Sequence, residues 1–190
     1  MSKAFLDGYF EQYRQLAFEP RIYREIERFR DLAAAVRDRG GKMMFAGNGA
    51  SASLSEHGAV DFTKQGGVRS VTFHDPNLIT CFANDFGYDH WMAKAIEHHA
   101  KPEDAVVLIS VSGTSPSVVN AARQARGAGL PVVSFTGRDE DNPLKTLSDI
   151  ALWVPSHAYN VVESIHGIWL TATIDLLIGE AVYETRAVSL

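Results

Sequence analysis

The sequence predicts an α/β protein of the three-layer αβα type, in which a five-stranded parallel sheet lies between two layers of helices. Short apolar runs of strand length alternate along the chain with longer segments whose apolar residues recur at helical spacing. This alternation is typical of a parallel sheet that is covered on both faces. Glycine and serine also follow two of the apolar runs directly, which marks the ends of strands.

The expected elements follow one another without a linker or a repeat. Two helices fill residues 4–39, where Phe5, Tyr9 and Tyr13 mark one face of the first and Gly40 stops the second. Strands are expected at residues 42–46, 68–73, 105–109, 131–136 and 149–154. The remaining helices are expected at residues 51–64, 75–82, 88–99, 116–129 and 160–184, with a turn at residues 84–87.

Composition and charge narrow the possible partners. The chain has 190 residues, of which 46% are hydrophobic and 22% charged, which suits one domain over residues 1–190. Its formal net charge of −5 argues against direct nucleic-acid binding but not against an anionic ligand. The N-terminus lacks a signal-peptide core, and no run approaches the roughly 18 apolar residues of a membrane span. With its single cysteine, Cys81, the chain is expected to be cytoplasmic and to have no membrane partner.

A buried strand, a hydroxyl-rich loop and a helix start follow one another in residues 105–119. The first N–H groups of a helix have no partner within the helix and lie at the positive end of its dipole, so such a junction can bind phosphate. Pro116 suits the first helical turn, where its missing N–H costs nothing. An ordinary capped turn is the alternative. The expected phosphate-binding residues are Ser110, Ser112, Gly113, Thr114 and Ser115.

A second junction of the same kind covers residues 43–61. A strand again ends in glycine, and Ser51 lies at the start of the next helix. Open α/β sheets bind ligands in loops at the carboxyl ends of their strands, so the two loops together favour a ligand that carries a phosphate. Asn48, Gly49 and Ser51 are the candidate binding residues of this first loop.

The last helix predicts assembly with further copies of the chain. Its apolar residues leave little polar face, and one sheet face in a domain of this size cannot cover a helix that is apolar nearly all round. Burial against a partner subunit explains this pattern and predicts a homo-oligomer of closed symmetry. A central helix within a monomer is the alternative.

Six features occur in order over nearly the whole chain: AGNGASAS at 46–53, His57, ANDFGYD at 83–89, ISVSGTS at 109–115, SFTGRD at 134–139 and VPS at 154–156. In this combination the chain resembles the sugar isomerase (SIS) domain family, and within it the phosphoheptose isomerases. The resemblance implies a flavodoxin-like SIS fold, a homotetramer and a phosphorylated-sugar ligand. It divides the chain into N-terminal oligomerisation helices, residues 1–40, and a phosphosugar-binding core, residues 41–190.

The resemblance also implies roles for individual loop residues. In this family the second loop grips the phosphate, the first loop contacts the sugar phosphate, and a third loop borders the active site. The residues that match the phosphate-gripping loop are Ser110, Ser112 and Ser115. Asn48 and Ser51 match the loop that contacts the sugar phosphate, and Asn84 and Asp85 match the loop that borders the active site.

The catalytic positions depart from the family pattern. The family has a glutamate where this chain has Asp61. On the last helix the family has a glutamine where this chain has Glu163, and a histidine where this chain has Thr171. A family aspartate is replaced by Asn160, whereas a histidine is retained as His166. In the family these positions supply an acid–base pair and a zinc site.

Two hypotheses follow for these positions. His57 and Asp61 are four residues apart, so they share a helix face and could bind zinc together with Glu163. Aldose–ketose isomerisation needs a base and an acid, and Asp61, Glu163 and His166 are the candidates for these proton transfers. Asp61 is one methylene shorter than glutamate, a loss of reach of roughly 1 Å. The alternatives are an exposed His–Asp pair and a hydrogen-bonded core histidine.

The sequence therefore supports two functions. The first is an aldose–ketose isomerase acting on sedoheptulose 7-phosphate or a related ketose phosphate, with or without zinc. The second is a non-catalytic SIS module that binds phosphosugars as a sensor or scaffold, resembling the initiator-associating protein that binds DnaA. Thr171, in place of the family's histidine, favours the second function, whereas the carboxylates at Asp61 and Glu163 favour the first.

Overall fold

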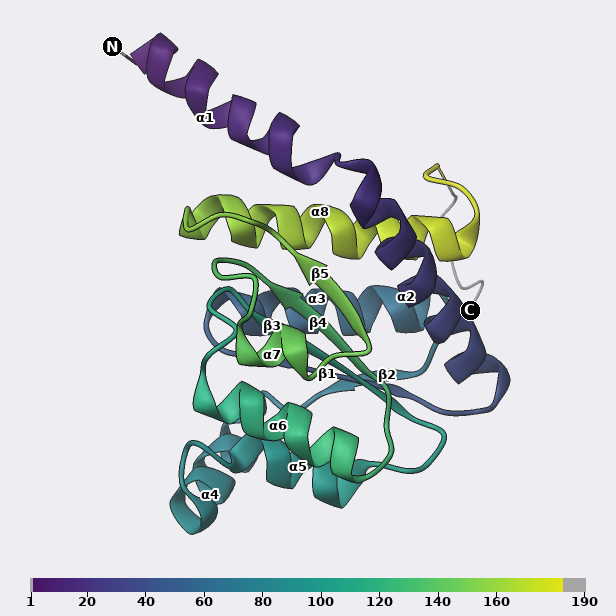
Figure 1. Cartoon of the computed structure of the whole chain (residues 1–190). Helices are drawn as coiled ribbons and strands as arrows, with labels where there is room; N and C mark the ends of the chain where they lie inside the picture. Colours follow the sequence, from purple (N-terminus) through teal and green to yellow (C-terminus); the bar gives the residue numbers. More distant parts are fainter. Residues whose placement is uncertain (1, 183–190) are drawn as a thin grey trace, which may run out of the picture.

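Five parallel strands make up the central sheet, in the spatial order β2-β1-β3-β4-β5 (Figure 1). The structure, a computed structural model, describes residues 2–182 of the chain. β3 lies at the centre with β1 and β4 beside it, and the short β2 forms one edge. The strands are β1 (Met43–Gly47), β2 (Ser70–Thr72), β3 (Ala105–Ser110), β4 (Val132–Thr136) and β5 (Ile150–Trp153).

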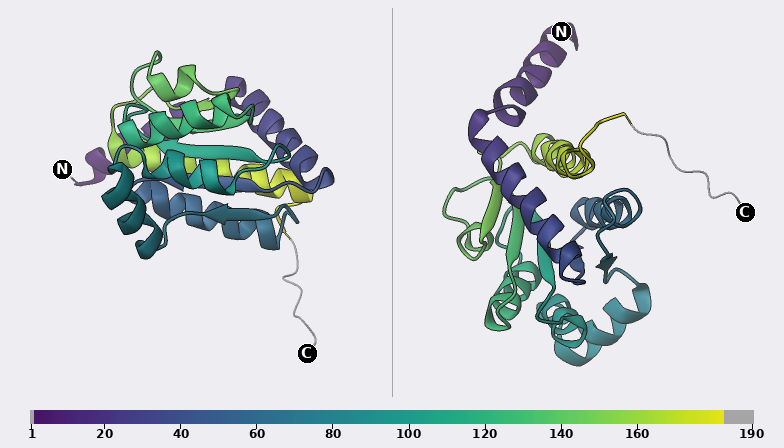
Figure 2. Two further views of the ribbon diagram at one scale, coloured as in Figure 1. Left: turned by 90° about the horizontal axis from the view of Figure 1, so that it is seen from below. Right: turned by 90° about the vertical axis from the view of Figure 1, so that its right-hand side faces the viewer.

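Helices cover both faces of the sheet, which confirms the predicted three-layer αβα architecture (Figures 1 and 2). One layer consists of α2 (Pro20–Asp38), α3 (Ala50–Lys64) and α8 (Tyr159–Ile178). The other layer contains α5 (Trp91–His99) and α6 (Pro116–Gly127). α4 (Pro76–Phe86) and the short α7 (Pro143–Thr146) also belong to this layer. The first helix of the chain is α1 (Ser2–Ala17).

Each strand supplies side chains to two separate cores. Met43 and Phe45 of β1 are fully buried with α2, α3 and α8, whereas Met44 and Ala46 are buried with α5 and α6. Successive side chains of a strand point to opposite faces, so one apolar run serves both layers. This is why the strands are apolar throughout rather than alternating with polar residues.

Three helix boundaries differ from those expected. α5 begins at Trp91 rather than at residue 88, because residues 88–90 form turns. α4 continues to Phe86, so Asn84 and Asp85 lie in its last turn rather than in a turn between helices. α8 ends at Ile178 because Gly179, at φ 96°, adopts the left-handed conformation that commonly follows a helix. Residues 183 and 184, which were expected to continue this helix, lie outside the described residues.

α7 is an element that the sequence analysis did not include. Asn142 is its N-cap and accepts the backbone N–H of Lys145 at 2.9 Å, and Pro143 follows at the first helical position. The helix has four residues, which is too short for a hydrophobic period to be recognised.

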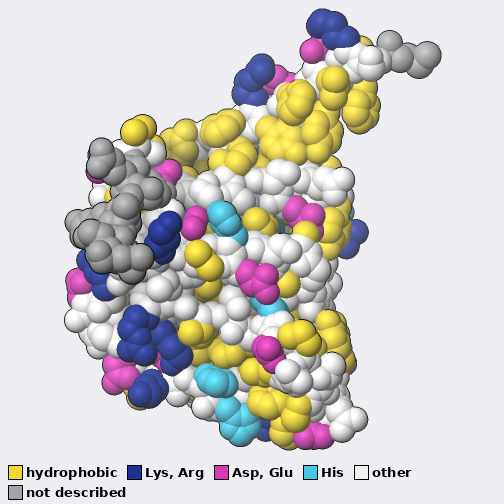
Figure 3. All heavy atoms as spheres, turned by 180° about the vertical axis from the view of Figure 1, so that it is seen from behind, with side chains coloured by type: hydrophobic (Ala, Val, Ile, Leu, Met, Phe, Trp, Pro, Cys, Tyr) yellow, Lys and Arg dark blue, Asp and Glu magenta, His cyan; other side chains and the backbone are white. Residues whose placement is uncertain are grey.

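α1 projects from the body of the molecule, and its N-terminal half extends away from the other helices (Figures 1 and 2). Its C-terminal end is held by Trp169 of α8, whose Nε1 donates to the carbonyl oxygen of Ala17 at 2.8 Å. Phe5 is 68% exposed and Phe10 is 58% exposed. Figure 3 shows hydrophobic side chains gathered on this projecting helix.

Within residues 2–182, α8 is the one helix that is long and apolar enough to cross a membrane by length and composition. A buried core helix passes the same test, and Val162, Ile165 and Leu170 of α8 are fully buried in the core with α2 and α3. Two further apolar residues of the helix, Ile168 and Leu176, are 37% and 39% exposed. α8 is therefore a core helix with an apolar strip left uncovered in the single chain.

Candidate functional site

The two loops that were predicted to bind a ligand lie side by side at the carboxyl edge of the sheet. β1 pairs directly with β3, with Gly47 opposite Ile109, so the residues after each strand emerge next to each other. Asn48 in the first loop donates from Nδ2 to Oγ of Ser117, in the first turn of α6, at 3.1 Å. This hydrogen bond joins the first loop to the helix that follows the second loop, and it brings the two junctions into one site.

The serine hydroxyls of the second loop are held so that their protons stay free. Ser110 Oγ accepts the backbone N–H of Gly113 at 3.2 Å, and Ser112 Oγ accepts that of Thr114 at 3.2 Å. A hydroxyl that accepts in this way still carries its own O–H as a donor. Ser115 is the N-cap of α6 but its side chain makes no capping bond. The loop therefore offers hydroxyl donors beside the positive end of a helix dipole, which suits a phosphate, although Pro116 has no N–H and the N–H of Val118 already donates to the carbonyl oxygen of Ser115 at 3.0 Å.

The conformation of the second loop depends on close contact with α7. Gly113 has a φ of 64°, and a Cβ at this position would lie 2.0 Å from Oδ1 of Asn142. Asn142 is 3% exposed, and its Nδ2 donates to the carbonyl oxygen of Asp139 at 2.8 Å. The backbone N–H of Leu144 donates to the carbonyl oxygen of Gly113 at 3.0 Å. Asn142 was not among the predicted site residues, because an Asn-Pro dipeptide indicates the start of a helix but not the loop against which that helix packs.

The first loop is supported from β2. A Cβ at Gly47 would lie 2.8 Å from the backbone of Ser51, so this loop turns tightly into α3. The N–H of Gly47 donates to Nε2 of His74 at 3.4 Å, and the His74 side chain is 6% exposed. Burial lowers the pKa of His74, while Glu56, 3.5 Å from its Nδ1, acts to raise it. A neutral His74 is the form that accepts this hydrogen bond.

Asn84 and Asp85 are exposed, and they bond to each other, with Asn84 Nδ2 2.9 Å from Asp85 Oδ1. Tyr88, three residues further on, makes the contact with the first loop: its hydroxyl donates to Oδ1 of Asn48 at 3.0 Å. The motif at residues 83–89 marked this loop, but it did not indicate which side chain reaches the site.

His57 and Asp61 form a pair on α3, with Nε2 of His57 3.1 Å from Oδ2 of Asp61. The His57 side chain is 59% exposed and that of Asp61 is 18% exposed. Their spacing of four residues places them together on one helix face, as expected. Their roles in catalysis and metal binding stay predictions.

α3 and α8 lie side by side and run in the same direction. Their contacts advance together along both helices, so that Leu54 packs against Gly167, Gly58 against Leu170 and Gly66 against Leu177. The second turn of α8, which contains Glu163, is consequently level with the first turn of α3, at the carboxyl edge of the sheet.

This arrangement separates the two candidate carboxylates. Glu163 is level with the start of α3. Asp61 is level with a part of α8 that lies about ten residues after Glu163, which is roughly 15 Å along the helix axis at 1.5 Å per residue. A single chain therefore does not bring Asp61 and Glu163 together. Burial raises the pKa of Glu163 above its ordinary value.

His166 is fully buried beneath the sheet's carboxyl edge. Its Nε2 donates to the carbonyl oxygen of Thr136 at 3.0 Å, and its Nδ1 is buried without a hydrogen-bond partner within residues 2–182. The rings of Phe135 and Trp169 lie 5.7 Å and 6.5 Å from its ring. Burial lowers its pKa to about 4. This placement fits the alternative of a core histidine better than a group that touches a substrate.

In the part of the chain that the structure describes, no group of three His, Cys, Asp or Glu side chains could hold a metal ion. The predicted ligands are divided: His57 and Asp61 lie together, and Glu163 lies far along α8 from them. Two donors do not complete the tetrahedral set that zinc takes in proteins. The described residues of one chain therefore do not fit a zinc site.

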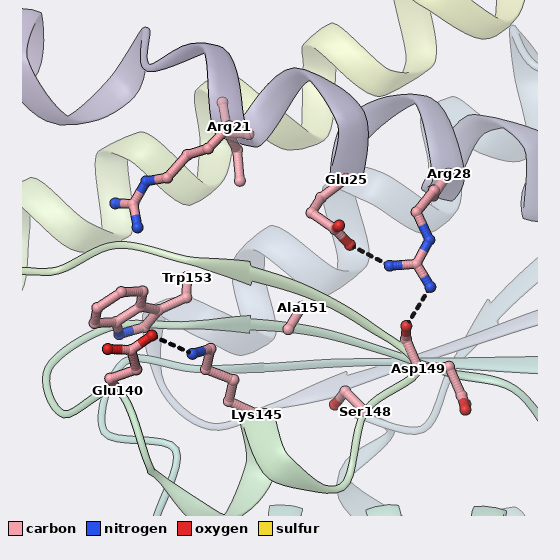
Figure 4. A pocket seen from close by; sticks show the side chains of 10 residues that line it. Arg21, Glu25, Arg28, Glu140, Lys145, Ser148, Asp149, Ala151 and Trp153 are labelled. Carbon is pink, nitrogen blue, oxygen red and sulfur yellow. Dashed lines mark hydrogen bonds and ion pairs between the residues drawn. The ribbon is translucent and has the colours of Figure 1, made fainter.

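A hollow of about 320 Å³ lies between α2 and the edge strand β5, away from the two loops (Figure 4). Arg21 and Lys145 approach the Trp153 ring to within 5.3 Å and 4.5 Å of its centre. Arg28 pairs with Glu25 at 2.7 Å, and Lys145 pairs with Glu140 at 3.4 Å. Because these cations are already paired, the hollow is a weaker anion site than the two loops.

Comparison with known proteins identifies the family of this chain. The SIS domain model matches residues 9–137. The chain belongs to the SIS domain family. It is 36% identical over 164 residues to a phosphoheptose isomerase of Solidesulfovibrio magneticus, covering 82% of this chain and 79% of that protein. It is 31% identical over 162 residues to the phosphoheptose isomerase of Fusobacterium nucleatum, covering 83% of each.

A solved phosphoheptose isomerase from Neisseria gonorrhoeae has the same fold as this SIS domain. The two structures superpose with a TM-score of 0.84 at 26% identity, covering 93% of this chain and 96% of the other. The similarity to phosphoheptose isomerases predicted from the motifs is thereby confirmed.

Replacing Gly113 by alanine is expected to disrupt the second loop. The positive φ costs about 1–2 kcal/mol, and the overlap with Asn142 adds roughly 1–3 kcal/mol. Gly129→Ala is the matched control, because Gly129 has a φ of 74° and nothing lies within 4 Å of its Cβ position. Urea unfolding of both variants measures the difference. Equal losses of stability would show that Asn142 does not constrain the loop.

His166 is expected to make the protein less stable as the pH falls. Its folded-state pKa of about 4 lies below the ordinary 6.5, so between these values the unfolded chain binds a proton that the folded chain does not. The free energy of unfolding should fall by about 3 kcal/mol across this window because of His166. Denaturant unfolding at several pH values should show this loss removed in His166→Gln and kept in His57→Gln. An unchanged pH dependence in His166→Gln would contradict the burial argument.

Proposed function

We propose that this SIS domain protein is an aldose–ketose isomerase of a phosphorylated sugar, with sedoheptulose 7-phosphate or a related ketose phosphate as substrate. The observation that carries the proposal is the Asn48–Ser117 hydrogen bond of 3.1 Å, which makes one site of two loops suited to phosphate. Similar proteins named phosphoheptose isomerase, matched over about four fifths of this chain, support the reaction class.

The phosphate would bind at the start of α6. Hydroxyls of Ser110, Ser112 and Ser115 and the first N–H groups of the helix donate to its oxygens, and the positive end of the helix dipole stabilises its charge. Gly113 leaves the backbone open to a close approach, because it has no Cβ. The sugar would extend from there toward Asn48 in the first loop.

Glu163 is the base that we propose for the proton transfer between C1 and C2. It lies level with the start of α3, and burial raises its pKa above the ordinary value of a carboxyl group, which makes the carboxylate a stronger base. Asp61 would reach the same sugar only from a neighbouring subunit, because of its distance along α3. His166 would hold the end of β4 through Thr136 rather than contact the sugar.

A non-catalytic phosphosugar-binding module is the second candidate function. The observation that favours it is the separation of Asp61 from Glu163 along the two parallel helices of one chain. Thr171 occupies the position of the family's last-helix histidine, and its hydroxyl cannot ionise near neutral pH; it bonds instead to the carbonyl oxygen of Gly167 at 3.0 Å. Such a module would keep the two loops and bind the same ligand without turnover.

We further propose a homotetramer in which residues 1–40 serve oligomerisation and residues 41–190 form the phosphosugar-binding core, in a cytoplasmic protein. The exposed aromatic side chains of α1 and the uncovered strip of α8 are apolar surfaces that water disfavours. Phe5 and Tyr9 stack at 6.0 Å, so α1 presents a continuous aromatic face. A second copy of the chain would cover both surfaces.

The isomerase proposal is tested by incubating the full chain with sedoheptulose 7-phosphate in deuterated water and following aldose formation and C1 exchange by NMR. We expect turnover, and a kcat lower by about 100-fold or more in Glu163→Gln with a KM near the wild-type value, because the base acts in the transition state. Parallel reactions with added Zn²⁺ and with chelator test whether turnover depends on a metal.

Glu140→Gln is the matched control, since Glu140 is exposed and lines the hollow beside β5 instead of the loops. Full activity in Glu163→Gln would contradict the assignment of the base, and full activity in Asp61→Asn would remove Asp61 from the mechanism. Saturable binding without turnover by the wild type would favour the non-catalytic module.

The assembly is tested by light scattering on the purified chain. We expect the mass of four chains, and a smaller mass for a Phe5→Ser, Phe10→Ser double variant, because these side chains are expected to be buried between subunits. Val71→Ser on the β2 edge, also partly exposed, is the control that should keep the wild-type mass. A wild-type mass of one chain would contradict the oligomer.

A further inference from the structure

Tyr88 links the segment between α4 and α5 to the first loop. Gly87, at φ 82° and ψ 151°, ends α4 in a conformation that glycine adopts readily, and the chain then turns toward α6. Asn120 of α6 donates from Nδ2 to the carbonyl oxygen of Asp89 at 3.0 Å, which anchors this segment. The Tyr88 ring lies 6.5 Å from the ring of the buried Trp91. The position of the Tyr88 hydroxyl is therefore set by its surroundings.

The hydrogen bonds of Asn48 decide what the Tyr88 hydroxyl can still do. The hydroxyl donates its proton to Oδ1 of Asn48 at 3.0 Å, because a carbonyl oxygen can only accept. Asn48 in turn uses one N–H of Nδ2 for Oγ of Ser117 at 3.1 Å. What remains is the second N–H of Asn48, a donor, and the lone pairs of the Tyr88 oxygen, an acceptor. Tyr88 is 56% exposed, so this acceptor is accessible to a ligand.

We propose that Tyr88 and Asn48 together recognise one hydroxyl of the sugar, close to its phosphate, and that Tyr88 is thus a specificity-determining residue. An alcohol hydroxyl both donates and accepts, so it matches an adjacent acceptor and donor. A phosphate oxygen matches the Asn48 N–H only, because the Tyr88 proton is already committed. Ser117 belongs to the first turn of α6, so the hydroxyl must lie near the phosphate that binds this helix start. This inference rests on the proposed phosphosugar function.

The test compares sugar phosphate with inorganic phosphate, each titrated calorimetrically into the full chain. Tyr88→Phe removes the acceptor and keeps the ring, so the Kd for sedoheptulose 7-phosphate should rise by about tenfold. The Kd for inorganic phosphate should stay unchanged, because inorganic phosphate binds at the start of α6 and lacks the neighbouring sugar hydroxyl that Tyr88 is proposed to contact. Tyr23→Phe is the matched control: Tyr23 is 51% exposed, and its hydroxyl donates to the carbonyl oxygen of Phe18, on another part of the chain.

A deoxy analogue identifies the hydroxyl. The 6-deoxy analogue of sedoheptulose 7-phosphate lacks the hydroxyl on the carbon next to the phosphorylated carbon, and it should bind wild type and Tyr88→Phe equally. Unchanged binding of sedoheptulose 7-phosphate by Tyr88→Phe would overturn the inference alone. So would equal weakening for inorganic phosphate, which would mean that Tyr88 only supports the loop. A wild-type chain that binds neither ligand would overturn the proposed function itself, and this inference with it.

Discussion

The parallel pairing of β1 with β3 is the constraint on which the candidate site depends. The strands are far apart in sequence, yet their register sets Gly47 opposite Ile109, and the segments that follow them leave the sheet at the same edge. Two helix starts therefore open beside each other, and their dipoles add at one place. The Asn48–Ser117 hydrogen bond then fixes the distance between them. Without this pairing each loop would be an ordinary turn into a helix.

The groups that the candidate site offers to an anion are neutral. Hydroxyls, backbone N–H groups and one amide face the start of α6, which is compatible with a protein whose net charge is −5. Such donors act only where they are held in place, because flexible ones lose entropy on binding. α7 supplies that rigidity through the packing of Asn142 against Gly113, and His74 supplies it for the first loop through Gly47.

Binding and chemistry are separated in this molecule. The loops are assembled within one chain, whereas the carboxylates that would move protons are spread along two parallel helices. Glu163 lies at the level of the loops, and Asp61 lies beside His57 on the more exposed part of α3. The exposed apolar surfaces of α1 and α8 also favour an oligomer, since burying such surfaces between subunits lowers the free energy of the protein in water. An oligomer would then complete both the hydrophobic packing and the set of catalytic groups.

The sequence by itself determined the classes and the order of the elements. The strand and helix periods, the Gly- and Ser-containing loops after β1 and β3, and the i, i+4 pairing of His57 with Asp61 depend on neighbours along the chain, and all were predicted. Some helix boundaries and the whole of α7 were not predicted, because a segment of a few residues is too short to show a hydrophobic period.

Only the tertiary structure decided which of these elements meet. Tyr88 reaches Asn48 across 40 residues, Asn142 closes on Gly113, and α8 carries His166 into the core. The same parallel packing of α3 and α8 keeps Asp61 away from Glu163, although the motif had grouped them. The physical reason is that hydrophobic period states which face of an element is buried, whereas contacts between elements depend on strand order and on how helices pack side by side.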